Sequence, residues 1–137
     1  TGKMLWNREV RRVDANQPIH SKNSHASPTP ILHDNAIFVH FGPLGTARLN
    51  LQGDIEWLNT ELSYPPVHGS GGSPVLLEDK LFVVCDGSTN PFVAALNTQT
   101  GKLIWKKQRV LQGKINHSFV TPTIAEVDGK HQLIAPG

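Results

Sequence analysis

Histidines recur at one position in this 137-residue chain. Three of the seven stand five or six residues before a proline: His25, His68 and His117. Imidazoles that converge can bind a metal ion, an anionic ligand or a substrate hydroxyl. Repetition also permits a simpler role, in which each imidazole satisfies backbone groups of its own loop. The pattern therefore leaves open a polar ligand or partner site, a metal or catalytic site, and a set of equivalent structural residues.

Other residues that could do chemistry lack the partners that the chemistry requires. Ser27 lies close to His25, but neither a third group nor a nucleophile elbow accompanies them, so no catalytic residue is predicted. The run Gly69–Gly72 has no lysine and no following helix, which favours a close approach of backbone over a phosphate-binding loop. Cys85 is the only cysteine, which excludes an intrachain disulfide and a cysteine-rich metal site.

Two repeats indicate the elements that position these residues. A glycine is followed four positions later by tryptophan three times, at Gly2 and Trp6, Gly53 and Trp57, and Gly101 and Trp105. The glycine suits a tight turn with positive φ, and the tryptophan can pack against the neighbouring copy. The tryptophans lie 51 and 48 residues apart, a spacing typical of propeller blades.

A second repeat begins at the three prolines, Pro30, Pro74 and Pro122. After each proline the pattern predicts a short strand, a turn and a second strand. The first two copies continue with a glycine loop, a third strand, the turn that carries the glycine and tryptophan, and a fourth strand. The sequence therefore predicts an all-β fold, a β-propeller fragment of four-stranded antiparallel blades. The expected divisions are 1–10 (the last strand of a blade, Met4–Val10), 29–59 and 73–108 (two whole blades) and 121–137 (the first strands of another).

This topology predicts where the candidate site lies. In a propeller, the segment leading into the innermost strand and the loop between the second and third strands open at the same mouth of the central channel. The predicted ligand-binding residues of this rim are His25, Ser27, His40, His68, Ser70, Asp86 and His117. The tryptophans are expected to pack between blades, and Arg48 is expected to face solvent.

Charge and hydropathy exclude some partners. The formal net charge is only +2, and the basic residues form no long run, so neither nucleic acid nor a membrane surface is an expected partner. No apolar stretch is long enough for a transmembrane helix.

Residues 95–105 fit the pattern Ala-x-Asp-x-x-Thr-Gly-Lys-x-x-Trp, with Asn97 in place of the aspartate, and Thr1–Trp6 fits its second half. This motif resembles the tryptophan-docking repeat of the PQQ-like (quinoprotein-like) β-propeller family, above all its uncharacterised bacterial members. The quinone-binding enzymes of that family carry a vicinal cysteine pair and a calcium site. Cys85 has no neighbouring cysteine and Asp86 has no evident Glu or Asn partners, so neither PQQ nor calcium is expected, and no cofactor or metal is predicted.

The resemblance implies a ligand- or protein-binding or scaffold module that is periplasmic or extracellular. Its expected partners are an unknown protein or small polar ligand and the remaining blades of the same propeller. The alternative is part of a quinoprotein-type dehydrogenase, or of another propeller enzyme, with its catalytic residues in other blades.

Overall fold

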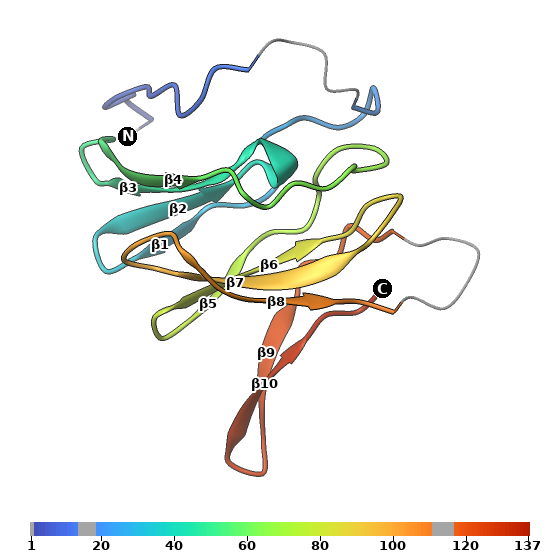
Figure 1. Ribbon diagram of the computed structural model, residues 1–137. Helices are drawn as coiled ribbons and strands as arrows, with labels where there is room; N and C mark the ends of the chain where they lie inside the picture. The colour runs from blue at the N-terminus through green and yellow to red at the C-terminus, as the bar shows by residue number, and fades with distance from the viewer. Residues whose placement is uncertain (1, 14–18, 111–116) are drawn as a thin grey trace.

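Ten strands form three antiparallel sheets in the computed structural model, which describes residues 2–13, 19–110 and 117–137 (Figure 1). The first sheet has the order β1 (Ile31–His33), β2 (Ala36–His40), β3 (Thr46–Asn50), β4 (Ile55–Asn59), with the 3-10 turn η1 (Gly42–Leu44) between β2 and β3. The second has the order β5 (Val75–Leu77), β6 (Lys80–Cys85), β7 (Phe92–Asn97), β8 (Leu103–Gln108). The third is the hairpin β9 (Thr123–Val127) and β10 (Lys130–Ile134). The predicted all-β fold of four-stranded antiparallel blades is confirmed.

The turns between strands follow from local chemistry. Asn97 accepts hydrogen bonds through Oδ1 from the backbone N–H groups of Gln99 and Thr100, at 3.1 and 3.0 Å. Asn50 does the same in the first blade, with Gln52 and Asp54 as donors at 2.9 Å each. An asparagine side chain that accepts from the backbone two or three residues on is a standard way to close a turn. Asn97 therefore closes its turn without the aspartate of the repeat pattern.

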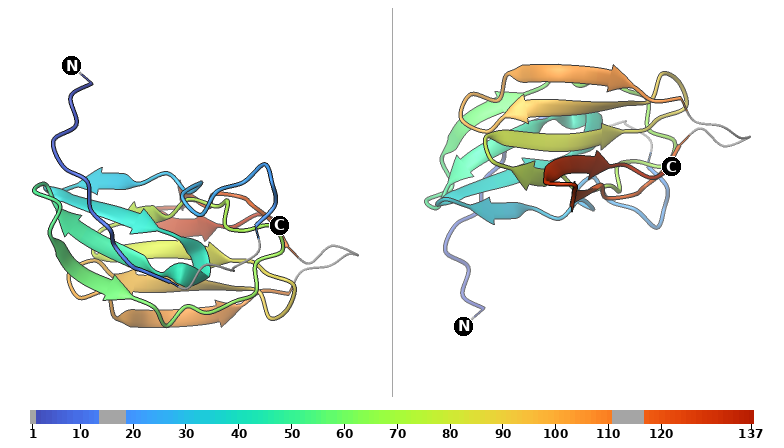
Figure 2. Two further views of the ribbon diagram at one scale, coloured as in Figure 1. Left: turned by 90° about the horizontal axis from the view of Figure 1, so that it is seen from above. Right: turned by 90° about the horizontal axis from the view of Figure 1, so that it is seen from below.

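The core lies between the two whole blades rather than within either sheet. Ala36 and Phe38 of β2 face a cluster that includes Leu81 and Val83 of β6, and Tyr64 from the connection between the blades adds to it. Figure 2 shows the sheets stacked face to face, as blades pack in a propeller. Each blade thus depends on its neighbour to bury one of its faces.

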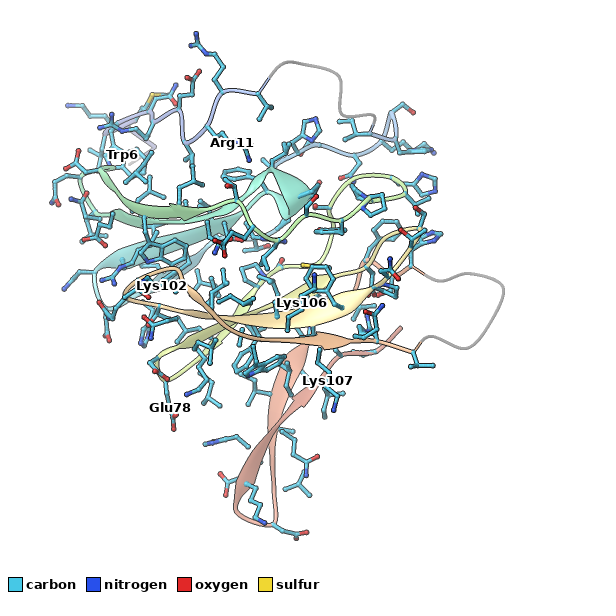
Figure 3. The ribbon with its side chains drawn as sticks, in the orientation of Figure 1. Trp6, Arg11, Glu78, Lys102, Lys106 and Lys107 are labelled. Carbon is cyan, nitrogen blue, oxygen red and sulfur yellow. The ribbon has the colours of Figure 1, made fainter. Side chains whose placement is uncertain are left out.

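The first part of the chain differs from the sequence prediction. The structure forms no strand between Gly2 and Val13, so the expected strand Met4–Val10 is wrong. This segment runs as irregular chain beside the first blade (Figure 1), and no strand within the described residues lies beside it to supply backbone partners. Side chains hold it instead: Figure 3 shows Trp6 at one end of the blade and Arg11 near η1, where Arg11 donates to the carbonyl oxygen of Leu44 at 2.5 Å.

Tryptophan docking is nevertheless the same at both blades. The indole N–H of Trp6 donates to the carbonyl oxygen of Leu51 at 2.8 Å, and that of Trp57 donates to Thr98 at 2.9 Å. Each indole ring lies against the turn glycine of the next repeat. A Cβ at Gly53 would be 2.7 Å from the ring of Trp6, and a Cβ at Gly101 would be 2.5 Å from the ring of Trp57. Glycine is required at both positions.

A second contact accompanies each docked tryptophan. Arg8, two residues after Trp6, donates from Nε to the carbonyl oxygen of Gly53 at 2.7 Å. Asn59, two residues after Trp57, donates from Nδ2 to the carbonyl oxygen of Gly101 at 2.8 Å. The repeat unit for docking is therefore a tryptophan and the residue two positions after it, even where these residues belong to no strand.

Arg48 also joins the two blades, and the expectation that it faces solvent is wrong. Its side chain is 15% exposed and donates to the carbonyl oxygen of Thr98 at 3.1 Å and to the side chain of Gln99 at 2.6 Å. Its Nε lies 2.7 Å from a carboxylate oxygen of Glu56. The position lies in the interface between the blades, where two of its partners, Thr98 and Gln99, come from the next repeat.

Candidate ligand-binding face at the channel mouth

The first strands of the three sheets line a common hollow. β1, β5 and β9 border an open cavity of about 660 Å³ whose wall is mostly apolar, with Leu32, Val75, Leu76 and Ile124 among its residues. We call the end that leads into these strands the mouth face, and the opposite end, with the tight hairpin turns, the turn face. The loops β2–β3 and β6–β7 lie at the mouth face, as Figure 1 shows.

Hydroxyl groups join the leading segments around this hollow. The backbone N–H of Thr29 donates to Oγ of Ser73 at 2.8 Å, and the backbone N–H of Ser73 donates to Oγ1 of Thr121 at 2.9 Å. Each of the three residues directly precedes an anchor proline. An equivalent hydrogen bond therefore recurs from blade to blade and fixes the position of each leading segment relative to the next.

Three histidines and a phenylalanine gather on the mouth face. The ring of His68 lies 5.3 Å from that of His20 and 5.9 Å from that of His117, both edge to face. Phe119 is stacked on His68 at 6.0 Å and lies 5.6 Å from His117. The four rings, which we call the histidine cluster, come from three successive leading segments.

Glycines allow these segments to lie side by side. A Cβ at Gly69 would be 2.8 Å from Nδ2 of Asn23, and one at Gly72 would be 2.6 Å from the carbonyl oxygen of Val120. Nδ2 of Asn23 also donates to the carbonyl oxygen of His68 at 2.8 Å. The Gly69–Gly72 run is therefore a place of close backbone approach, and its neighbours are the adjoining leading segments.

His25 and Ser27 lie on the mouth face but outside the histidine cluster. His25 is exposed and borders a small cavity together with Ile19 and Ser70. Oγ of Ser27 donates to the side chain of Asn23 and to the carbonyl oxygen of Ser24, so it stabilises its own turn.

His40 and Ser70 are buried under the mouth face. Nδ1 of His40 lies 2.8 Å from Oγ1 of Thr46, while its Nε2 is buried without a partner among the described residues. Burial lowers the pKa of His40 to about 4, so the ring is neutral near neutral pH. Oγ of Ser70 lies 3.2 Å from the hydroxyl of Tyr64, whose pKa is raised above its ordinary value, mainly by burial.

Asp86 is also buried and forms part of a polar link between the second and third sheets. Its Oδ2 accepts from Arg109 and from the hydroxyl of Ser118, the latter at 2.7 Å. Arg109 donates in turn to the carbonyl oxygens of Ala135 and Pro136 after β10, at 2.8 and 2.9 Å. The Asp86 carboxylate thus orients an arginine that holds the last described segment.

The residues of the mouth face do not fit the quinone and calcium site of the PQQ enzymes. Cys85 is the only cysteine and is buried, and its burial raises the pKa of the thiol. Oδ2 of the Asp86 carboxylate is engaged by Arg109 and Ser118, while its buried Oδ1 has no hydrogen-bond partner among the described residues. Within residues 2–13, 19–110 and 117–137, no three His, Cys, Asp or Glu side chains are placed to share a metal ion. What the mouth face exposes is aromatic and imidazole surface.

Two members of the histidine cluster, His20 and Phe119, escaped the sequence analysis. The spacing to the following proline pointed to His25. The spacing from blade to blade points instead to His20, because His20, His68 and His117 lie 48 and 49 residues apart, close to the period of the blades. That period was the signal available in the sequence.

No family model and no curated protein matches the sequence. Solved structures do match, 45 chains in all. One, described as a europium-containing methanol dehydrogenase, aligns with a TM-score of 0.52 at 19% identity, over 66% of this chain and 18% of that chain. At this identity the likeness shows the fold alone, which is that of a PQQ-like propeller. The described residues contain no helix that is long and apolar enough to cross a membrane.

Proposed function

We propose that this PQQ-like propeller segment is a binding or scaffold module whose partner engages the mouth face. The observation that carries the proposal is the histidine cluster, because rings from three successive blades form one surface. Such a surface recognises a partner only when the blades stand side by side. The cluster also includes Phe119, an exposed aromatic side chain of the kind enriched in protein interfaces.

A selection of binding peptides would test this proposal. The chain is immobilised and offered a random peptide library, and the selected peptides are measured against Phe119→Ala and His68→Ala. His33→Ala, an exposed histidine on the turn face, is the matched control. We expect the selected peptides to lose affinity for the two mouth variants and to keep it for the control. Peptides that bind all variants equally, or a library that yields no binder, would overturn the proposal.

Calorimetry with PQQ and Ca²⁺ addresses the enzyme alternative. The proposal expects no saturable heat of binding, because the donor groups required for the quinone and its calcium ion do not fit here. Stoichiometric binding would instead favour part of a quinoprotein-type dehydrogenase.

A location outside the bacterial cytoplasm belongs to the same proposal and is supported by the sequence resemblance alone. Fractionation of cells that make the full protein would test it.

A further inference from the structure

We infer that the partner at the mouth face is an acidic segment of another protein, which places carboxylates against the histidine cluster and an apolar side chain beside it. This inference rests on the proposed function and adds the chemistry of the partner.

The carboxylates of the chain are unevenly divided between its two ends. The mouth face exposes His20, Lys22, His25 and His68, with His117 half-buried beside them. Carboxylates are scarce there among the described residues: Asp86 is buried against Arg109, and Glu61, which is exposed, lies two residues after the end of β4, the outermost strand.

The turn face carries more carboxylates, and cations pair with several of them: Arg8 with Asp54, and Lys80 with Glu78 and Asp79. Exposed carboxylates lie on its hairpin turns, at Asp34, Asp54, Glu78 and Asp79. Glu78 is labelled in Figure 3, away from the loops of the mouth face. Opposite potentials attract and steer charged partners, so the mouth face is the end that favours an anionic one.

The groups around His68 add to this preference. The ring of His68 lies 5.3 Å from that of His20 and 5.9 Å from that of His117. The neighbours that face His68 from the adjoining segments are His20 and Asn23 on one side and His117 and Phe119 on the other, none of them acidic. The imidazole N–H groups of the cluster therefore have no carboxylate beside them among these groups, and a bound carboxylate would accept hydrogen bonds from them.

The apolar part of the surface adds the second requirement. Phe119 is 44% exposed, and Ile19, Val67 and Val120 are exposed beside the histidines in the chain. Exposed apolar groups bordered by polar ones mark interaction sites. A partner segment that pairs carboxylates with a leucine or phenylalanine matches both halves of this surface.

The shape of the site favours a protein segment over a small molecule. The cavity beside His25, Ile19 and Ser70 has a volume of about 10 Å³, while small-molecule sites occupy roughly 300–1,000 Å³. A cavity of that size has room for about one water. The hollow of about 660 Å³ is lined by residues of β1, β5 and β9 and by none of the histidine cluster. A ligand of the cluster therefore lies across the surface, as an extended peptide does.

A matched set of peptides tests the inference on the chain itself. A short peptide that alternates Glu with Leu is compared with versions carrying Gln or Lys in place of Glu, by fluorescence anisotropy at neutral pH. We expect the Glu peptide to bind at least about fivefold more tightly than the Gln peptide, as expected from one or two exposed charged contacts. That preference should weaken with added salt.

Variants locate the effect. His68→Ala should remove most of the preference for Glu, whereas His33→Ala, an exposed histidine at the far end of β1 paired with Asp34 at 3.2 Å, should leave it unchanged. Equal binding of the Glu, Gln and Lys peptides at the mouth would overturn the acidic partner but not the proposed function. Selected peptides that bind elsewhere would overturn both. Self-association of the chain that His68→Ala abolishes would make the occupant a second copy, and would likewise overturn the inference.

Discussion

Replacing Gly101 by alanine should lower the free energy of unfolding by about 2–5 kcal/mol. The glycine has φ +68°, where an L-residue is strained by about 1–2 kcal/mol. A Cβ there would lie 2.5 Å from Cε3 and 2.6 Å from Cδ2 of Trp57, so the indole must move. Forcing a group into a packed site costs about 1–3 kcal/mol, which includes loss of the hydrogen bond from Trp57 to Thr98.

Gly129 is the matched control, because its φ is +71° and a Cβ there would have no atom within 4 Å. Gly129→Ala should therefore cost only the backbone strain, about 1–2 kcal/mol. The assay is urea unfolding followed by far-ultraviolet circular dichroism, with the dependence on urea compared between variants.

A double-mutant cycle separates the two contributions at Gly101. In a Trp57→Ala background the Gly101→Ala change should cost no more than Gly129→Ala, since the ring that the Cβ meets is gone. The reasoning would be refuted if Gly101→Ala in the native background were no more costly than Gly129→Ala. It would also be refuted if Trp57→Ala left the cost at Gly101 unchanged.

Three further perturbations test other contacts. Ser73→Ala removes the acceptor of the Thr29 N–H and should cost about 0.5–1.5 kcal/mol in urea unfolding, whereas Ser73→Thr should cost less. Burial lowers the pKa of folded His40 to about 4, so between about pH 6.5 and pH 4 the unfolded chain binds a proton that the folded chain does not. The free energy of unfolding should therefore fall as the pH drops through this range. This part of the pH dependence should vanish in His40→Asn, and its persistence would contradict the assignment. Arg109→Ala leaves the buried Asp86 carboxylate without its cation and should cost about 3–5 kcal/mol, of which Asp86→Asn in the same chain should recover a measurable part.

Much of the fold could be predicted because its signals are local. The strand β3 follows from the residues between Gly45 and the turn at Asn50, and β7 from those between Pro91 and Asn97. In each case a turn residue lies at an end of a run of β-forming residues. Such signals need no knowledge of the neighbouring blade.

The errors share one cause, which is a partner distant in the sequence. Met4–Val10 has the composition of a strand, but a strand requires backbone partners, and here only side-chain contacts such as that of Trp6 with Leu51 are made. Arg48 is polar on a strand, yet its acceptors Thr98 and Gln99 belong to the next blade. A pattern read within one repeat cannot include contacts between repeats.

The candidate site was predicted in part for the same reason. His68 and His117 meet through their rings, and the prolines that follow them identified both. His25 has the same spacing to its proline, but the turn around Ser27 separates it from the cluster, and His20 occupies the equivalent place. Loop length before a proline varies among the blades, whereas the period between blades is set by packing.

The mouth face separates the contacts that hold the blades from the side chains available for binding. The leading segments are joined through the Ser73 hydroxyl, through Asn23 and through glycines that admit a neighbouring backbone. At His68 the hydrogen bonds from the adjoining segment go to the backbone carbonyl oxygen, which accepts from Asn23 and from the backbone N–H of His20. The imidazole of His68 packs against the rings of His20, His117 and Phe119. Replacing this exposed side chain should therefore cost the fold little, because the backbone hydrogen bonds keep the blades in register.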